Sequence, residues 1–144
     1  MKLELNIDEK IKETLVVVSA NKIDKEVQNL INYIEYSSEY LIGIVEDKAS
    51  IIDIDEIIRV YIEDRKTFVV TLKDTYVVKK KLYEVENIVT RNFVKISQSE
   101  IANIKFIKNL DFSNTGTIVI KYKNSDISYV SRRMIKEFKL KLGI

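Results

Sequence analysis

The sequence predicts a mainly β fold of the α+β class, in which short helices accompany antiparallel strands and a small α/β segment precedes them. Two observations carry this prediction. From residue 40 onward, apolar and polar residues alternate with a period of two over many short runs, which is typical of half-buried strands. Turn residues such as Asn114-Thr115-Gly116 separate these runs. With 46% hydrophobic residues, the chain can also bury a core.

Residues 1–46 form the predicted N-terminal α/β segment. Leu3, Leu5 and Ile7 alternate with polar residues as in a half-buried strand. Residues 15–18 are an apolar run with β-branched side chains that fits a more buried strand. Apolar residues then recur at helical spacing, which predicts a helix from about residue 24 to 36. We expect this segment to contribute packing or a surface for a partner, and no chemistry.

Short strands and two further helices are predicted after this segment. The strands are expected at residues 41–45, 50–54, 59–63, 67–72, 76–79, 93–96, 101–107, 117–122 and 127–130. The helices are expected at residues 81–89 and 132–142, with Ser131 capping the second helix and Gly143 ending it. No helix pair has the spacing of a helix-turn-helix, so loops or strand ends must carry any DNA contact.

The composition excludes several functional classes. The chain has neither cysteine nor histidine, so a disulfide, a thiolate nucleophile or a Ser–His–Asp triad cannot form. Its three glycines form no phosphate-binding loop. We therefore predict no enzymatic activity, no cofactor and no metal. The sequence also has no apolar run of membrane-spanning length and no secretory signal, so a cytoplasmic location is expected.

Charge is divided unevenly along the chain. Residues 1–58 carry 6 basic and 13 acidic residues, a balance of −7, whereas residues 59–144 carry 18 basic and 9 acidic residues, a balance of +9. Such a split indicates that the second part faces a polyanion, for which a nucleic-acid backbone is the obvious candidate. Ordinary clustering of surface charge explains the split equally well at this point.

Three stretches, in order, resemble the LytTR family of bacterial DNA-binding domains. Residues 58–63 lead into residues 66–72 as in the opening strand pair of the family. Residues 93–103, FVKISQSEIAN, match the central aromatic-x-basic-Ile-x-x-Ser run that is followed by Ile-x-Asn. Residues 127–133 match the closing strand and its Ser-Arg-Arg turn. The resemblance covers about residues 47–144 and leaves residues 1–46 as an extension.

The resemblance implies a stand-alone transcription regulator without a receiver domain, whose DNA-binding domain is residues 47–144. Members of the family insert loops into successive major grooves on one face of duplex DNA. The resemblance therefore implies tandem half-sites in double-stranded DNA as the target and a homodimer, at least on DNA. A small membrane protein often restrains such members and is a further partner that the resemblance implies.

Three loops would contact DNA if the family pattern is carried over residue by residue. The expected DNA-binding residues are Lys66, Thr67, Lys95, Ser97, Gln98, Ser99, Arg132, Arg133 and Lys136. A glutamine can bridge N6 and N7 of adenine, and an arginine can bridge O6 and N7 of guanine. Many members carry histidine at the place of Ser97 and a cation or asparagine at that of Gln98. We expect Asn103 to brace the central turn through hydrogen bonds to the backbone.

Arg132 and Arg133 give an argument that is independent of the resemblance. They lie at a predicted helix start, where the helix dipole disfavours positive charge, so their presence indicates a nearby anion. DNA is one such anion, and an ion pair with Asp126 or Asp111 is the alternative.

A protein-interaction module that has lost base readout and sequesters a partner through its acidic N-terminal third is the second functional hypothesis. A binder of single strands is a third, which the alternation of most aromatic residues with core positions disfavours.

Overall fold

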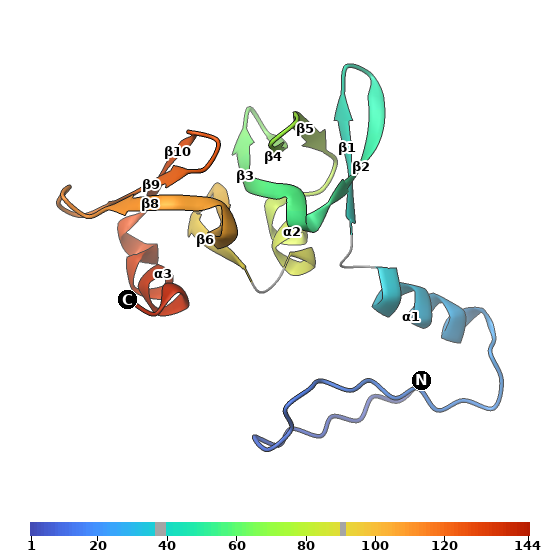
Figure 1. The fold of residues 1–144 in the computed structure, drawn as a ribbon. Coiled ribbons are helices and arrows are strands. Elements are labelled where there is room, and N and C mark those ends of the chain that lie inside the picture. Colours follow the sequence, from blue (N-terminus) through green and yellow to red (C-terminus); the bar gives the residue numbers. More distant parts are fainter. Residues whose placement is uncertain (37–39, 90–91) are drawn as a thin grey trace.

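The computed structural model describes residues 1–36, 40–89 and 92–144. In these residues ten strands form two antiparallel sheets, accompanied by three α-helices (Figure 1). The strands are β1 (Tyr40–Val45), β2 (Lys48–Asp53), β3 (Ile57–Glu63), β4 (Lys66–Thr71), β5 (Thr75–Val78), β6 (Phe93–Ser97), β7 (Glu100–Asn103), β8 (Ile107–Asp111), β9 (Ile118–Tyr122) and β10 (Ile127–Val130). The helices are α1 (Lys25–Tyr36), α2 (Leu82–Ile88) and α3 (Ile135–Leu142), and three 3₁₀ turns are η1 (Ile54–Glu56), η2 (Ile104–Phe106) and η3 (Arg132–Met134).

The strand order confirms the predicted mainly β, antiparallel class. The first sheet has the order β2-β1-β5-β4-β3-β7-β6, and the second has the order β10-β9-β8. Tight two-residue turns join β1 to β2 at Glu46-Asp47 and β3 to β4 at Asp64-Arg65. All four central residues of these turns have positive φ angles, as type I′ turns require.

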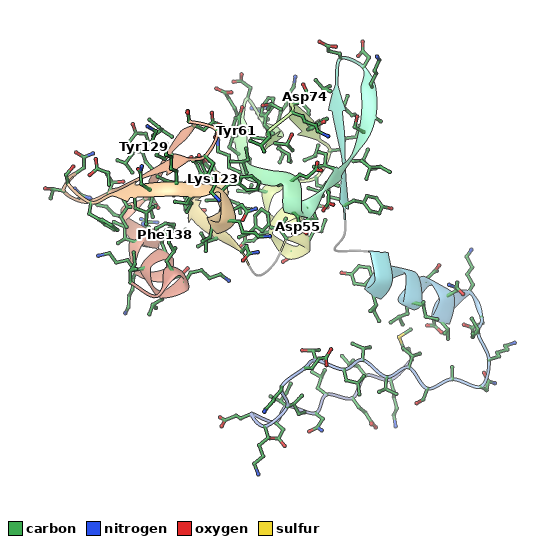
Figure 2. The ribbon with its side chains drawn as sticks, viewed as in Figure 1. Asp55, Tyr61, Asp74, Lys123, Tyr129 and Phe138 are labelled. Carbon is green, nitrogen blue, oxygen red and sulfur yellow. The ribbon has the colours of Figure 1, made fainter. Side chains whose placement is uncertain are left out.

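Two apolar clusters form the core. In the first, α2 covers the seven-stranded sheet and buries Val85 against strand residues such as Val60 and Val69. In the second, α3 packs Phe138 against residues of both sheets, including Ile96 and Tyr122. Figure 2 shows Phe138 beside the second sheet. The second cluster therefore joins the two sheets, which share no backbone ladder among the described residues.

The predicted strand over residues 101–107 is wrong, because the structure has two strands, β7 and β8, with η2 between them. The Asn103 side chain accepts a hydrogen bond from Lys105 N at 3.0 Å, and this local bond turns the backbone out of the ladder. Asp53 does the same before η1, where it accepts a bond from Asp55 N at 3.1 Å. Two successive strands are thus separated in the same way at both places.

The predicted strands in residues 3–7 and 15–18 are also wrong for this structure. Among the described residues, 1–24 contain neither strand nor helix, and their side chains are exposed. A strand needs a neighbour to satisfy its backbone, and Figure 1 shows this segment apart from both sheets. The helix predicted at residues 24–36 is confirmed as α1.

The predicted division at residue 46 stays a prediction, because it is not tested as a domain boundary. The seven-stranded sheet itself begins earlier, since β1 pairs with β2 from Tyr40↔Asp53 to Val45↔Lys48. Residues 37–39 of the extension lie outside the described residues.

The C-terminal helix begins later than predicted. Arg132–Met134 form η3, and α3 starts at Ile135. Ser131 occupies the N-cap position of η3, but its side chain makes no capping hydrogen bond, which corrects the expected cap. Gly143 ends α3 as predicted, with φ 73° and its N–H donating to Leu140 O and Lys139 O.

Candidate nucleic-acid interface

The β3–β4 and β6–β7 turns lie next to each other at one end of the first sheet. β3 and β7 are antiparallel neighbours with Tyr61 opposite Glu100. Ile62 N also donates to Ser99 O at 2.9 Å. The chain therefore reverses at Asp64-Arg65 and at Gln98-Ser99 on the same edge of the domain.

The start of η3 is held beside the second of these turns. Ser131 N donates to Ile96 O at 2.8 Å, so Arg132 and Arg133 follow directly after a residue bonded to the end of β6. Both arginines are exposed. The structure thus brings together the three loops that the sequence singled out, although they are separated by more than thirty positions in the chain.

Most of the expected DNA-binding residues are accessible on these loops or on the strands and helix beside them. Lys66, Gln98 and Ser99 are exposed, and so is Lys136 on α3, while Lys95 and Ser97 are half-buried. Ser97 Oγ accepts a hydrogen bond from Ser99 N at 3.2 Å, which shapes the turn around Gln98. Only the accessible polar groups of this set can meet a ligand without rearrangement of the fold.

Thr67 is the exception among the expected contact residues. It is only 6% exposed, because the turn ends before Lys66 and β4 has already begun there. Successive side chains of a strand point to opposite faces, so an exposed Lys66 places Thr67 inward. The expectation that Lys66 and Thr67 lie in the loop is corrected: Lys66 is the first residue of β4 and stays exposed, whereas Thr67 is buried and is left out of the proposed interface.

A hollow of about 430 Å³ lies between the two turns and the start of α2. Its lining residues are Ile62, Arg65, Thr67, Lys81, Leu82, Tyr83, Lys95 and Gln98. The cations Arg65, Lys81 and Lys95 form no ion pair within the described part of the chain. Sequence reasoning missed Arg65 and Lys81. The antiparallel pairing of Thr67 with Val78 brings the lysines after β5 to this end, and that pairing is non-local.

The two arginines after β10 differ in what surrounds them. The Arg132 side chain lies over Gly116, where an added Cβ would come within 2.6 Å of Arg132 Nε. Gly116 has φ +81°, so this close approach and its turn both favour glycine. Neither arginine forms an ion pair with the described carboxylates, so the expected alternative with Asp126 or Asp111 is not found. Arg133 remains free to meet an external anion.

Asp126 instead belongs to a polar cluster around Arg59 that spans the two sheets. Arg59 Nε lies 3.0 Å from Asp126 Oδ2, and Arg59 Nη1 lies 3.5 Å from Glu100 Oε2. Ser128 Oγ donates to the same Glu100 oxygen. Arg59 also lies 4.6 Å from the centre of the Tyr61 ring. Figure 2 labels Tyr61 on the first sheet and Tyr129 on the second.

This cluster, which we call the Arg59 cluster (Arg59, Glu100, Asp126 and Ser128), relates the loops to one another. Glu100 directly follows the turn with Gln98, while Ser128 belongs to the strand that leads to Arg133. Burial raises the pKa of Glu100, and the hydrogen bond from Ser128 and the charge of Arg59 oppose that rise. The ion pairs and the hydrogen bond of this cluster therefore connect the two sheets from which the loops extend.

In this domain, exposed cations lie at strand ends and on loops, while α2 and α3 pack on the two apolar clusters. A sequence profile described as the LytTr DNA-binding domain matches residues 47–143, and the chain belongs to this family. Family membership places the chain among DNA-binding regulators and not among enzymes.

Full-length relatives and a solved structure are consistent with this assignment. Proteins described as uncharacterized HTH-type transcriptional regulators of Staphylococcus aureus are 31% (strain MW2) and 30% (strain COL) identical over 146 residues, covering 100% of this chain and 99% of each relative. The LytTr DNA-binding domain of a putative methyl-accepting/DNA response regulator from Bacillus cereus has the same fold, with a TM-score of 0.71 at 21% identity. It covers 74% of this chain and 98% of that structure.

The described residues show no helix-turn-helix, because α2 and α3 are separated by the five strands β6 to β10. Among these residues, no helix combines the length and the apolar character that a membrane span requires.

Proposed function

We propose that this protein regulates transcription by binding duplex DNA in a sequence-specific manner through its three converging loops. The convergence of Lys66, Gln98 and Arg133 at one end of the domain is the observation that carries the proposal. Loops of this kind can enter a major groove, which is wide enough to admit protein elements and displays a distinct pattern for each base pair.

The side chains suggest a division between base readout and backbone contact. Arg133 is suited to bridge O6 and N7 of a guanine, and Gln98 to bridge N6 and N7 of an adenine. Lys66, Lys95 and Lys136 would contact phosphates, together with Arg65 and Lys81 around the hollow. Phosphate contacts fix the register of the protein on the duplex, and the base contacts then decide the sequence.

Two protomers are proposed to occupy tandem half-sites, each presenting the same loops to the DNA. The protein would then be a homodimer at least on DNA, as the family resemblance implies. A small membrane protein that restrains the regulator is a further proposal from the same resemblance, and the cytoplasm is the proposed location.

The proposed function is tested by a gel shift on the protein's own promoter region at two salt concentrations. Random duplex and single-stranded DNA serve as competitors. We expect a complex that random duplex does not displace and that weakens as salt rises, because counterions are released from phosphates on binding. Where Lys66 is replaced by alanine, Lys73→Ala is the matched control variant. Lys73 is an exposed lysine in the β4–β5 turn, at the opposite end of β4 from Lys66. No complex at low salt, or equal competition by single strands, would contradict the proposal.

A further inference from the structure

The N-terminal arm, which we define as residues 1–36, packs on neither apolar cluster of the domain. Among the residues that the structure describes, none before Leu41 belongs to either cluster. Leu3, Ile7 and Leu15 are more than four-fifths exposed, at 83%, 88% and 81%. In Figure 1 the whole arm, including α1, lies apart from the sheets. An exposed apolar segment of this size marks an interaction surface.

The pattern of the arm calls for more than one layer of cover. Leu3, Leu5 and Ile7 give one apolar strand face, which α1 could cover with Val27, Leu30 and Ile31. Residues 15–18 are apolar on both faces of a strand, as in strands that are covered on both sides. One arm offers a single helix and two short segments with strand-like patterns, and an isolated hairpin is marginally stable. A second layer must come from another molecule.

The arm lies outside the part of the chain that the family profile matches, which begins at residue 47. The solved Bacillus cereus domain is matched over 98% of its length by 74% of this chain, so the shared fold does not need the whole chain. The Staphylococcus aureus relatives, in contrast, align over 100% of this chain. The arm is therefore a part of the full-length relatives that this domain fold does not require.

The charge of the arm suits an identical arm better than a polyanion. It carries five lysines and seven acidic residues, interspersed along the sequence. A near-balanced mixture of signs offers no attraction to DNA or to an anionic membrane surface. Two copies related by a twofold axis place the same patch on both sides, so that lysines of one arm can meet acidic residues of the other.

We propose that the arms of two copies pair with each other, and that this association dimerises the protein without DNA. Residues 3–7 and 15–18 of each copy would form a four-stranded sheet, whose apolar faces α1 and its twofold mate cover. In this arrangement the backbone groups of both segments would find hydrogen-bond partners, and the second apolar face of residues 15–18 would be covered. This inference does not rest on any DNA contact, so it and the proposed function can fail separately.

Analytical ultracentrifugation of the full chain without DNA tests the pairing. We expect a dimer at micromolar concentrations, and a loss of affinity of about 100-fold or more in the double variant Leu5→Asp, Val17→Asp, because unpaired charges are costly to bury. Leu140→Asp is the control, since Leu140 is also exposed, at 72%, but lies on α3. A wild-type monomer throughout this range, or a dimer that survives in the double variant, overturns the proposal.

Cross-linking gives a second readout that does not depend on a destabilising substitution. The chain has no cysteine, so Ser19→Cys places a single thiol in the arm and Ser125→Cys places one in the β9–β10 turn. We expect oxidation to link two Ser19→Cys chains several-fold more than two Ser125→Cys chains. Equal cross-linking of the two variants overturns the proposal. Binding of a single DNA half-site by the double variant Leu5→Asp, Val17→Asp reports the proposed function independently.

Discussion

Three neighbouring side chains, Lys66 at the start of β4, Gln98 in the β6–β7 turn and Arg133 after β10, carry the proposed recognition of DNA. Each is exposed, and Lys66 and Arg133 form no ion pair among the described residues. The sequence identified these three residues through the family pattern. It placed Thr67 wrongly, because a run of polar residues does not reveal where a turn ends and a strand with alternating faces begins.

Replacing Arg133 by alanine should weaken binding to a cognate site by roughly 1–3 kcal/mol and relax specificity at one base pair. The reason is the loss of a bidentate contact to guanine. Fluorescence anisotropy on the cognate duplex and on single-base variants measures both effects. Lys73→Ala should leave both unchanged. Cognate binding by Arg133→Ala that matches wild type would show that another residue reads this base.

Replacing Lys66 by alanine should weaken binding to cognate and random duplex alike. Because one phosphate contact is lost, the slope of log affinity against log salt should become shallower by about one. The slope is obtained from anisotropy titrations across a salt series, with Lys73→Ala as the matched lysine. A change of specificity at constant slope would instead assign Lys66 to base readout.

Among the elements, the link between β7 and β8 is supported by one buried side chain. Asn103 is 1% exposed and donates to Ile57 O at 2.7 Å, while its oxygen accepts from Lys105 N. The sequence predicted that Asn103 braces the turn, and this is confirmed. The sequence pattern did not predict η2, because the apolar residues continue past Asn103 into β8 as if the strand were unbroken. A period of two finds strands and cannot show a one-turn interruption between them.

Replacing Asn103 by alanine should lower the free energy of unfolding by roughly 1–3 kcal/mol, because Ile57 O would be left buried without a donor. Asn109→Ala, at an exposed position of β8, serves as the control and should be near neutral. Urea denaturation followed by circular dichroism measures both variants. Equal stability of the two would mean that water replaces the Asn103 contacts.

Glu100 should make the stability of the fold depend on pH. Its folded pKa is raised, chiefly by burial, so the folded state holds a proton that the unfolded state releases between the unfolded value of 4.5 and the raised pKa. The contribution of this group to stability therefore falls as pH rises through that window. Wild type should gain stability relative to Glu100→Gln as pH is lowered from neutrality toward 4.5, as measured by urea denaturation. Parallel curves for the two proteins would refute this.

For the molecule as a whole, the site depends on contacts between distant segments. The three loops meet because β3 pairs with β7 and because Ser131 bonds to the end of β6. The Arg59 cluster then links the two sheets that carry these loops. Local patterns predicted the strands and their turns, but this strand order follows from pairings that are remote in the sequence. Only the family resemblance indicated that the loops converge.

The N-terminal arm shows the opposite relation between pattern and structure. Its alternation in residues 3–7 is as regular as that of the strands in the domain, yet the single chain forms no strand there. A hydrophobic pattern records that a face is to be covered and does not record which molecule covers it. The proposed pairing of arms would reconcile the predicted strands with the structure.

The β3–β4 turn implies a conflict between stability and function. Arg65 has φ 62°, a left-handed conformation that disfavours a residue with a Cβ. Glycine would fit this turn with less strain, yet the position is occupied by the cation Arg65, at the edge of the proposed interface. The β1–β2 turn has the same geometry, with Asp47 also at φ 62°. Because β1 is antiparallel to β5 and β5 is antiparallel to β4, this turn follows the end of β1 that points away from Lys66.

This pair of turns allows the conflict to be measured. Arg65→Gly and Asp47→Gly should each raise the free energy of unfolding by up to about 1 kcal/mol, because the strain is relieved and only part of it is offset by the freer unfolded chain. Arg65→Gly alone should weaken DNA binding. If so, the loop that meets the DNA is an optimum for affinity and not for stability, and variants selected only for thermal tolerance should lose this arginine first.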